Sequence, residues 1–309
     1  MAAERTPRSL IVSFYGAFGR GAGPDSGRVP VAALIRLLGA VGVDAPAVRS
    51  AVSRLKRRGL LVPVRHGGEA AYALSPSART LLDDGDRRIY RRDTPASPGD
   101  WLLAVFSVPE SERRKRHLLR SRLTRLGFGQ AAPGVWIAPA HIAEETRHTL
   151  RRLELAPYVD LFRGVHEGFT PTPEAVARWW DLPAIAKLHE AFLDAQEPVL
   201  RTWTEGRDAP DAAGDAPGQA ARDSRDARNG RDERDGRDER DGRDERAYRD
   251  YLLALDAWRE LPYADPGLPA DVLPQDWPGA RAAEVFAALH DRLHTPASRY
   301  ARTRLHPAR

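Results

Sequence analysis

The chain contains 309 residues, of which 42% are apolar and 29% are charged, with a formal net charge of +5. This length and apolar content suffice for two or three domains with hydrophobic cores, which excludes a disordered chain. The absence of cysteine excludes disulfides, thiolate catalysis and cysteine-ligated metal sites, and the absence of an 18-residue apolar stretch argues against a membrane span. Because no cleavage pattern follows the short apolar run at residues 10–18, the sequence predicts a cytoplasmic protein.

The first segment, residues 7–92, is predicted to be basic and helical, with one hairpin. Residues 1–92 together carry 16 Lys or Arg residues against 7 Asp or Glu residues, an excess that favours a polyanionic partner. Three helices are expected where apolar residues recur three and four positions apart, at residues 10–18, 30–41 and 44–58. Two strands around a glycine turn follow, at residues 61–65 and 70–74. This order, completed by a helix from Pro76, predicts a winged helix-turn-helix, a fold that binds DNA.

The third of these helices is the strongest candidate for a functional surface. The apolar residues that form its buried face are Val48, Ala51, Val52 and Leu55. Its Arg and Ser side chains then face outward, where an arginine fork can bind guanine O6 and N7 and serine can reach bases or phosphates. The candidate DNA-binding residues on this helix and on the hairpin turn are Arg49, Ser50, Ser53, Arg54, Lys56, Arg57, Arg65 and His66. The alternative is an ordinary solvated basic face, which the helix order and the glycine-rich hairpin disfavour.

The middle segment, residues 100–170, follows a linker at residues 93–99. Strands are predicted at residues 101–108, 135–137 and 159–165, with a further strand near Phe128, and helices at residues 111–126 and 141–155. This alternation predicts a ferredoxin-like α/β sandwich. The first of its helices carries a basic cluster that begins at Arg113, which could contact DNA phosphates, an acidic ligand or a partner subunit, or be a solvated outer face.

The last segment, residues 174–300, is predicted to be a helical domain with an insertion. Residues 205–246 contain the tandem Arg-Asp-Glu-Arg-Asp-Gly at 231–236 and 237–242. Because this six-residue period contains no apolar residue, the sequence predicts a disordered, solvated insertion. The fold class expected for the whole chain is therefore α+β and multidomain: a winged helix-turn-helix, a ferredoxin-like sandwich and a helical C-terminal domain.

The sequence offers little for enzyme chemistry. It lacks the glycine-rich dinucleotide fingerprint, the phosphate-binding loop and the Gly-x-Ser-x-Gly elbow. His290 and His294 lie four positions apart on a predicted helix and could share a metal ion, but no third ligand lies near them in the sequence. We therefore expect no catalytic residues, no metal site and no cofactor.

Short motifs along nearly the whole chain carry a family resemblance. In the N-terminal and middle segments they are Ser9-Leu10-Ile11-Val12, the helix 34–38, the helix 48–55, Trp101-Leu102-Leu103 and Gly134-Val135-Trp136-Ile137. In the C-terminal segment they are Trp258-Arg259-Glu260, Asp265-Pro266-Gly267-Leu268-Pro269, Leu273-Pro274 and Trp277-Pro278-Gly279. Together and in this order they resemble the PaaX family, bacterial repressors of phenylacetic-acid catabolism.

The resemblance implies a dimeric regulator that binds a partly palindromic double-stranded DNA operator. It implies release from the operator by an aryl-acetyl coenzyme A thioester, typically phenylacetyl-CoA. The middle domain of the family is similar to small ferredoxin-like nucleases that carry an acidic metal ligand at the end of the first strand. Ser107 stands at about that position in this sequence, so the resemblance implies a sandwich without catalytic activity.

Three residues are candidate effector contacts, namely Trp136, Arg259 and Trp277. An arginine suits the phosphates of coenzyme A, and aromatic rings suit its aryl or adenine group. The usual burial of tryptophan favours the alternative that both Trp residues belong to the core and that Arg259 is part of an ion pair. Two other functions stay open at this point: a metal-dependent nuclease that uses the ferredoxin-like segment, and a DNA-binding protein without an effector.

Overall fold

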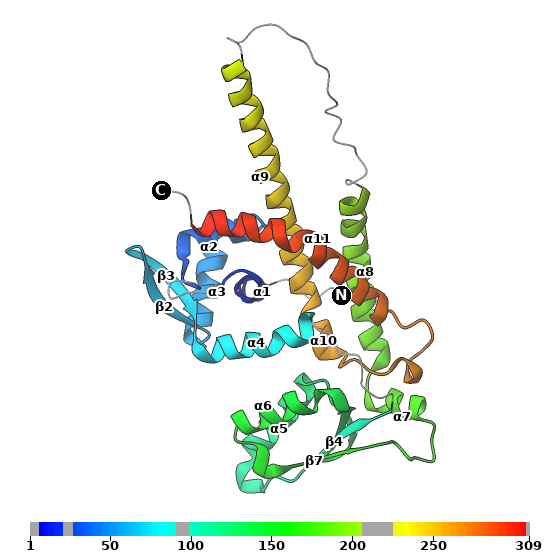
Figure 1. Cartoon of the computed structure of the whole chain (residues 1–309). Helices are drawn as coiled ribbons and strands as arrows, with labels where there is room; N and C mark the ends of the chain where they lie inside the picture. Colours follow the sequence, from blue (N-terminus) through cyan, green and yellow to red (C-terminus); the bar gives the residue numbers. More distant parts are fainter. Residues whose placement is uncertain (1–5, 21–26, 91–98, 206–224, 307–309) are drawn as a thin grey trace. The chain divides into compact units, whose positions relative to one another are not determined.

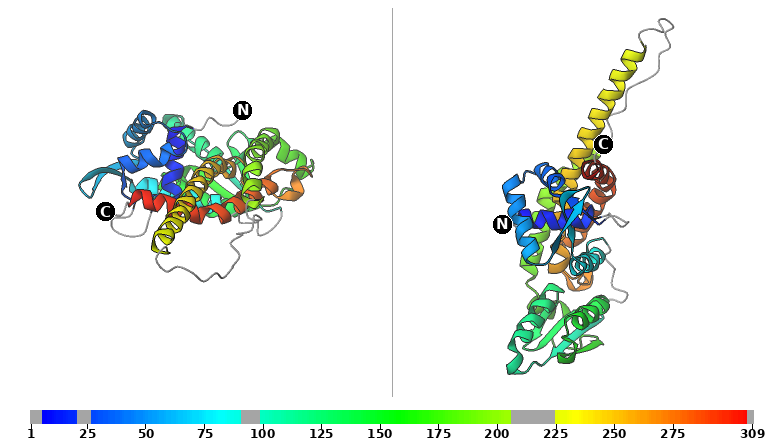
Figure 2. Two further views of the ribbon diagram at one scale, coloured as in Figure 1. Left: turned by 90° about the horizontal axis from the view of Figure 1, so that it is seen from above. Right: turned by 90° about the vertical axis from the view of Figure 1, so that its left-hand side faces the viewer.

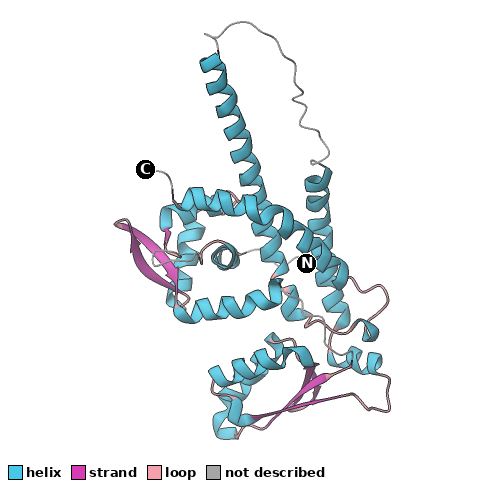
Figure 3. Ribbon diagram, viewed as in Figure 1, coloured by secondary structure: helices cyan, strands magenta, loops and turns pink. Residues whose placement is uncertain are grey.

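The computed structural model describes residues 6–20, 27–90, 99–205 and 225–306. Within these ranges the prediction of a mixed α+β chain is confirmed, with two antiparallel sheets among many helices (Figure 1, Figure 3). Contacts divide the chain into two compact units. Unit 1 contains Leu81–Leu193 and Ala257–Ala283, and unit 2 contains Ala3–Thr80, Asp194–Asp256 and Glu284–Arg309. Residues 174–300, which the sequence assigns to one helical domain, contribute to both units.

The first elements of unit 2 follow the predicted order of three helices and a hairpin. They are α1 (Pro7–Ala17), β1 (Val29–Pro30), α2 (Val31–Gly39), α3 (Ala45–Arg57), β2 (Leu61–His66) and β3 (Glu69–Leu74). The three strands form an antiparallel sheet in the order β1-β3-β2. The sequence does not predict β1, because two residues are too few to show a period. Pro30, expected to open a helix, ends β1 and occupies the N-cap position of α2.

The packing of α1 against α3 sets the orientation of the third helix. Leu10, Ile11 and Phe14 of α1 are at most 3% exposed, as are Val48 and Leu55 of α3. Burying an aliphatic or Phe side chain of this size contributes about 1.5–3 kcal/mol relative to leaving it exposed. Since the apolar stripe of α3 is held inward in this way, its Arg and Ser side chains face solvent.

Parts of α8 (Leu182–Glu205), α9 (Arg225–Trp258) and α11 (Gly279–Leu305) complete unit 2. Helix α9 packs against α1, because Ser9 and Ser13 each donate a hydroxyl hydrogen bond of 2.6 Å to Asp256. The aromatic ring of Phe18 also lies 5.3 Å from that of Tyr248. The N-terminal part of α9, drawn in yellow, extends beyond the other helices of unit 2 in every view (Figure 1, Figure 2).

The prediction of a disordered insertion over residues 205–246 is wrong for residues 225–246, which form the first turns of α9. A segment without an apolar face can be held in a helix by ion pairs, which hydrophobic periodicity does not reveal. Asp244 is 4% exposed and accepts two hydrogen bonds from Arg299 of α11, and Arg304 donates to Asp241 at 2.9 Å. Residues 206–224 of the predicted insertion, and residues 93–98 of the predicted linker, lie outside the described residues.

Unit 1 contains the second sheet, built in the order strand, helix, two strands, helix, strand. Its elements are β4 (Trp101–Phe106), α5 (Arg113–Arg125), β5 (Gly129–Ala132), β6 (Val135–Pro139), α6 (Ala143–Arg152) and β7 (Val159–Gly164). The strand order is β5-β6-β4-β7 and every pair is antiparallel. The strand expected near Phe128 is therefore present, as β5. One face of the sheet packs on α5 and α6, where Leu102, Trp136 and Leu119 belong to one buried cluster.

The opposite face of this sheet carries a second buried cluster. Trp101 and Ile137 there contact residues of α7 (Thr172–Trp179), of the start of α8 and of the segment 268–277. Helices α7 and α8 are separate because Trp180, between them, adopts an extended conformation. The remaining elements of the chain are α4 (Pro76–Tyr90) and α10 (Leu261–Ala264). None of the described helices is long and apolar enough to cross a membrane.

Candidate functional site

Residues next to helix α3 in the sequence determine where the helix starts and ends. The side chain of Asp44 accepts a hydrogen bond of 2.7 Å from the backbone N–H of Ala47, and Pro46 occupies the first turn, where a missing N–H costs nothing. Gly59, with φ of +68°, follows the last turn in the left-handed region that glycine enters most readily. The helix is therefore fixed at both ends by residues within the same short segment.

The outward face of α3 presents the polar side chains that the sequence predicts. All six candidates on this helix are exposed, namely Arg49, Ser50, Ser53, Arg54, Lys56 and Arg57. Within the part of the chain that the structure describes, Arg49, Arg54 and Arg57 form no ion pair or hydrogen bond through their side chains. A row of guanidinium groups without internal partners is suited to binding an external polyanion.

The two candidates on the hairpin are arranged differently from each other. Arg65 is exposed, and its guanidinium donates to the carbonyl of Gly68 at 2.9 Å, which holds the side chain across the turn. His66 is half-buried, and its ring lies 5.8 Å from the ring of His306, just beyond the end of α11. The structure thus places Arg65 on the surface of the hairpin and His66 against the C-terminal helix.

The Asp44 cap provides a local test of how α3 is held. We expect Asp44→Ala to lower the free energy of unfolding by about 1 kcal/mol, because the N–H of Ala47 loses its acceptor. Asp44→Asn should retain most of that stability, since an amide oxygen also accepts this bond. Urea unfolding followed by circular dichroism measures both variants, and equal losses in the two would contradict a capping role.

The three candidate effector contacts do not form one site. Trp136 belongs to the cluster between the sheet and helices α5 and α6. Trp277 packs against the cluster on the opposite face of the sheet, and its indole N–H donates to Asp265 at 3.4 Å. Arg259 is half-buried close to Tyr263, where burial raises the pKa of the phenol and the charge of Arg259 opposes that rise.

A buried polar group that the sequence does not predict lies beside Trp277. His189 is fully buried, and its Nε2 lies 3.0 Å from Oδ2 of Asp265. Asp265 also accepts hydrogen bonds from the backbone N–H groups of Gly267 and Leu268, at 2.9 and 3.3 Å. The two side chains are 76 positions apart in the sequence, so no local pattern connects them. This pair anchors the proline-rich segment 265–278 to α8.

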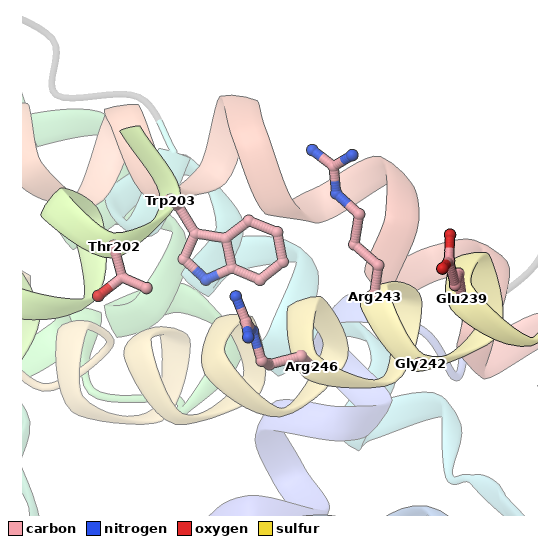
Figure 4. A pocket seen from close by; sticks show the side chains of 6 residues that line it. All are labelled: Thr202, Trp203, Glu239, Gly242, Arg243 and Arg246. Carbon is pink, nitrogen blue, oxygen red and sulfur yellow. The ribbon is translucent and has the colours of Figure 1, made fainter. Parts of the chain in front are cut away.

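A pocket of about 360 Å³ opens between the last turns of α8 and the repeat-bearing part of α9. The side chains that line it are those of Thr202, Trp203, Glu239, Arg243 and Arg246, together with Gly242 (Figure 4). The guanidinium of Arg246 lies 5.2 Å from the centroid of the Trp203 ring, and the indole N–H of Trp203 donates to Asp250 at 2.9 Å. Sequence reasoning missed this pocket because it treated residues 205–246 as disordered.

A concentration of arginine side chains lies between α5, α6 and α10. Burial and the charges of Arg125 and Arg152 lower the pKa of Arg122, whose buried Nε has no hydrogen-bond partner among the described residues. Arg88 is paired with Glu145 at 2.6 Å in the same region. In the described ranges, no group of three or more His, Cys, Asp or Glu side chains is placed to hold a metal ion.

Three family models match consecutive parts of the chain. They are described as PaaX-like protein over residues 6–78, PaaX protein central Cas2-like domain over residues 95–176, and PaaX-like protein C-terminal domain over residues 228–303. The third match includes most of α9. The family resemblance inferred from short motifs is therefore supported in each part of the chain separately.

Individual relatives agree with these matches. The chain is 25% identical over 299 residues to the transcriptional repressor PaaX of Escherichia coli strain K12, which covers 92% of this chain and 79% of that protein. Among solved structures it is similar to the uncharacterized protein Rv0674 from Mycobacterium tuberculosis, with a TM-score of 0.54 and 22% identity over 97% of this chain and 98% of the other. The second likeness concerns the fold alone. From the three family matches and the relative that spans nearly its whole length, the chain belongs to the PaaX family.

Proposed function

We propose that the protein is a transcriptional repressor of phenylacetate-type catabolic genes and that α3 reads its operator. The observation that carries the proposal is the exposed row of Arg and Ser side chains on a helix whose ends and buried face are fixed. The repressor from Escherichia coli that aligns over 92% of the chain supports the same function. Family membership and the chemistry of α3 thus lead to one activity.

We infer that the first part of unit 2 is a winged helix-turn-helix and that the sheet of unit 1 is a ferredoxin-like sandwich. The order helix, strand, helix, helix, hairpin with the sheet β1-β3-β2 supports the first inference. The order strand, helix, two strands, helix, strand with a fully antiparallel sheet supports the second. We retain a DNA-binding domain over residues 7–92, a sandwich over 100–170 and a C-terminal domain over 174–300 as the proposed functional division.

In the proposed mechanism two copies of the chain bind one operator. Two-fold symmetry places the two α3 helices in successive major grooves, so half-sites lie about 10 bp apart or a multiple of that distance. An aryl-acetyl-CoA such as phenylacetyl-CoA relieves repression by binding the released conformation more tightly. A 100-fold preference for that conformation corresponds to about 2.7 kcal/mol, which is enough to change operator occupancy.

The roles of Arg49 and Arg54 can be tested one at a time. Arg49→Ala or Arg54→Ala should weaken operator binding by about 1–3 kcal/mol if the side chain contacts a base, with a smaller loss on random DNA. Fluorescence anisotropy on both duplexes at one salt concentration measures the difference. Arg151→Ala, which removes an exposed arginine from α6, should leave both affinities unchanged. Equal losses on the operator and on random DNA would show that the arginine contacts phosphate only.

We propose a regulator rather than an enzyme, and the alternative of a metal-dependent nuclease is separately testable. Ser107 follows β4 directly, and its backbone N–H donates to the carbonyl of Tyr158 at 3.1 Å. A serine at this position does not supply the carboxylate that such nucleases use. Incubation of the full chain with labelled DNA and RNA in Mg²⁺ or Mn²⁺ should give no cleavage, and sustained cleavage would overturn this assignment.

A further inference from the structure

The N-terminal half of α5 borders a groove that the proposed DNA contact does not use. Its volume is about 740 Å³, and it lies between the basic face of α5 and Trp136 of the inner strand β6. The side chains that matter are those of Arg113, Arg114, Arg116, His117, Arg120 and Trp136. We infer that this groove binds a small molecule that carries two or more phosphate groups.

Three of the four arginine side chains in the groove have no ionic partner among the described residues. Arg116 pairs with Glu110 at 2.9 Å and donates to the carbonyl of Val108 at 2.8 Å. By contrast, Arg113, Arg114 and Arg120 form no ion pair or side-chain hydrogen bond within the described part of the chain. Like charges three to four positions apart on a helix repel each other. A bound polyanion would remove that repulsion and supply acceptors for the guanidinium groups.

Trp136 provides a second and independent observation. Its side chain lines the groove although the residue is only 6% exposed, and its buried indole Nε1 has no hydrogen-bond acceptor among the described residues. An unsatisfied buried donor is unfavourable and uncommon in folded proteins. An oxygen atom of a bound ligand would satisfy it once the side chains that cover the nitrogen move aside. The groove therefore combines free cations on one side with an unused donor on the other.

The spacing of the arginines indicates more than one anionic group on the ligand. Arg113 and Arg120 lie two turns apart, which corresponds to about 10 Å along the helix axis. The two guanidinium groups can each contact a different phosphate of an extended molecule, whereas a single phosphate requires both side chains to converge on it. The volume falls in the range of about 300–1,000 Å³ that is typical of small-molecule sites. A concave site of this size next to a nearly buried indole favours a small molecule over a DNA backbone.

The inference deepens the proposed function, because the groove would receive the phosphates of the proposed effector. Only this role of the groove as an effector site rests on the proposed function. Binding itself can be measured without DNA. Isothermal titration calorimetry on the full chain uses coenzyme A and ATP as probes with several phosphates, and inorganic phosphate as the probe with one. We expect coenzyme A or ATP to bind the wild-type chain at least tenfold more tightly than inorganic phosphate.

Two variants test the groove residues, and a third is a control outside the groove. Arg113→Gln with Arg120→Gln should weaken binding of the tighter nucleotide probe at least tenfold. Trp136→Phe, which keeps an aromatic ring and removes the Nε1 donor, should weaken it severalfold. The matched control Arg151→Gln lies on α6, outside the groove, and should leave binding unchanged. Circular dichroism of each variant shows whether the fold is retained.

Two results would overturn the inference. One is that neither coenzyme A nor ATP binds the wild-type chain more tightly than inorganic phosphate. The other is that the double arginine variant, shown to be folded, binds the probe as tightly as the wild type. If in either case the double variant also loses affinity for DNA, the groove contacts the nucleic-acid backbone instead. Failure of the proposed function would appear elsewhere, as operator binding that does not depend on Arg49 or Arg54.

Discussion

Replacing Asp256 with alanine should destabilise unit 2 by about 3 kcal/mol. Asp256 is 5% exposed and accepts hydroxyl hydrogen bonds of 2.6 Å from Ser9 and Ser13 of α1. Hydrogen bonds to a charged group contribute about 1.5–3 kcal/mol each, and the loss of solvation of the buried carboxylate offsets part of that sum. These bonds hold α9 against the helix that packs on α3, so the variant should also weaken operator binding.

Two further variants distinguish the loss of these hydrogen bonds from the effect of shortening the Asp256 side chain. Asp256→Asn keeps an acceptor of similar shape and should lose less stability than Asp256→Ala. The pair Ser9→Ala and Ser13→Ala leaves the carboxylate buried without its hydroxyl partners and should lose at least as much. Asp276→Ala, at an exposed aspartate, is the control in the same urea unfolding experiment. A loss below about 0.5 kcal/mol for Asp256→Ala, the range usual for surface substitutions, would contradict this account.

Replacing Arg299 with alanine should have an effect of similar size, about 3–5 kcal/mol, through the repeat-bearing helix. Arg299 donates from Nε and Nη2 to the two carboxylate oxygens of Asp244, each at 2.5 Å. Hydrogen bonds to Asp244 raise the pKa of Arg299, so the guanidinium stays charged. Because Asp244 is 4% exposed, removing its partner leaves a buried charge uncompensated, which is strongly destabilising.

The test compares Arg299→Ala with a double variant that removes both partners and with a control substitution on the same helix. The double variant Asp244→Ala with Arg299→Ala should be more stable than Arg299→Ala alone, because the uncompensated charge is gone. Arg302→Ala changes an exposed arginine on the same helix and should change the melting temperature little. Equal effects of Arg299→Ala and Arg302→Ala would show that Asp244 does not hold α9 against α11.

The N-terminal part of the fold was predictable because apolar spacing and capping residues specify it within short segments. The spacing of Val48, Val52 and Leu55 specifies the buried face of α3, and Asp44 specifies where the helix begins. The exposed candidates on α3 follow from the same periodicity. The hairpin strands and the strand near Phe128 were also predictable, because glycine turns and alternating apolar residues mark them within a few positions.

Contacts between distant residues account for what the sequence did not reveal. The pair Asp244 and Arg299 is 55 positions apart, and His189 and Asp265 are 76 positions apart. Neither pair has a local signature, so the sequence alone predicts a disordered insertion at the repeat and a single C-terminal domain. The half-burial of His66 against His306 arises in the same way, from a helix more than 200 positions further along the chain.

We propose that α3 gives this chain sequence-selective binding to an operator, from which an aryl-acetyl-CoA releases the protein. The most direct measurement is fluorescence anisotropy of the full chain on a duplex from its own promoter region and on random DNA, with and without phenylacetyl-CoA. We predict tighter binding to the promoter duplex, a loss of that preference in Arg54→Ala, and release by the thioester but not by free phenylacetate. Equal affinity for the promoter duplex and for random DNA would contradict the claim.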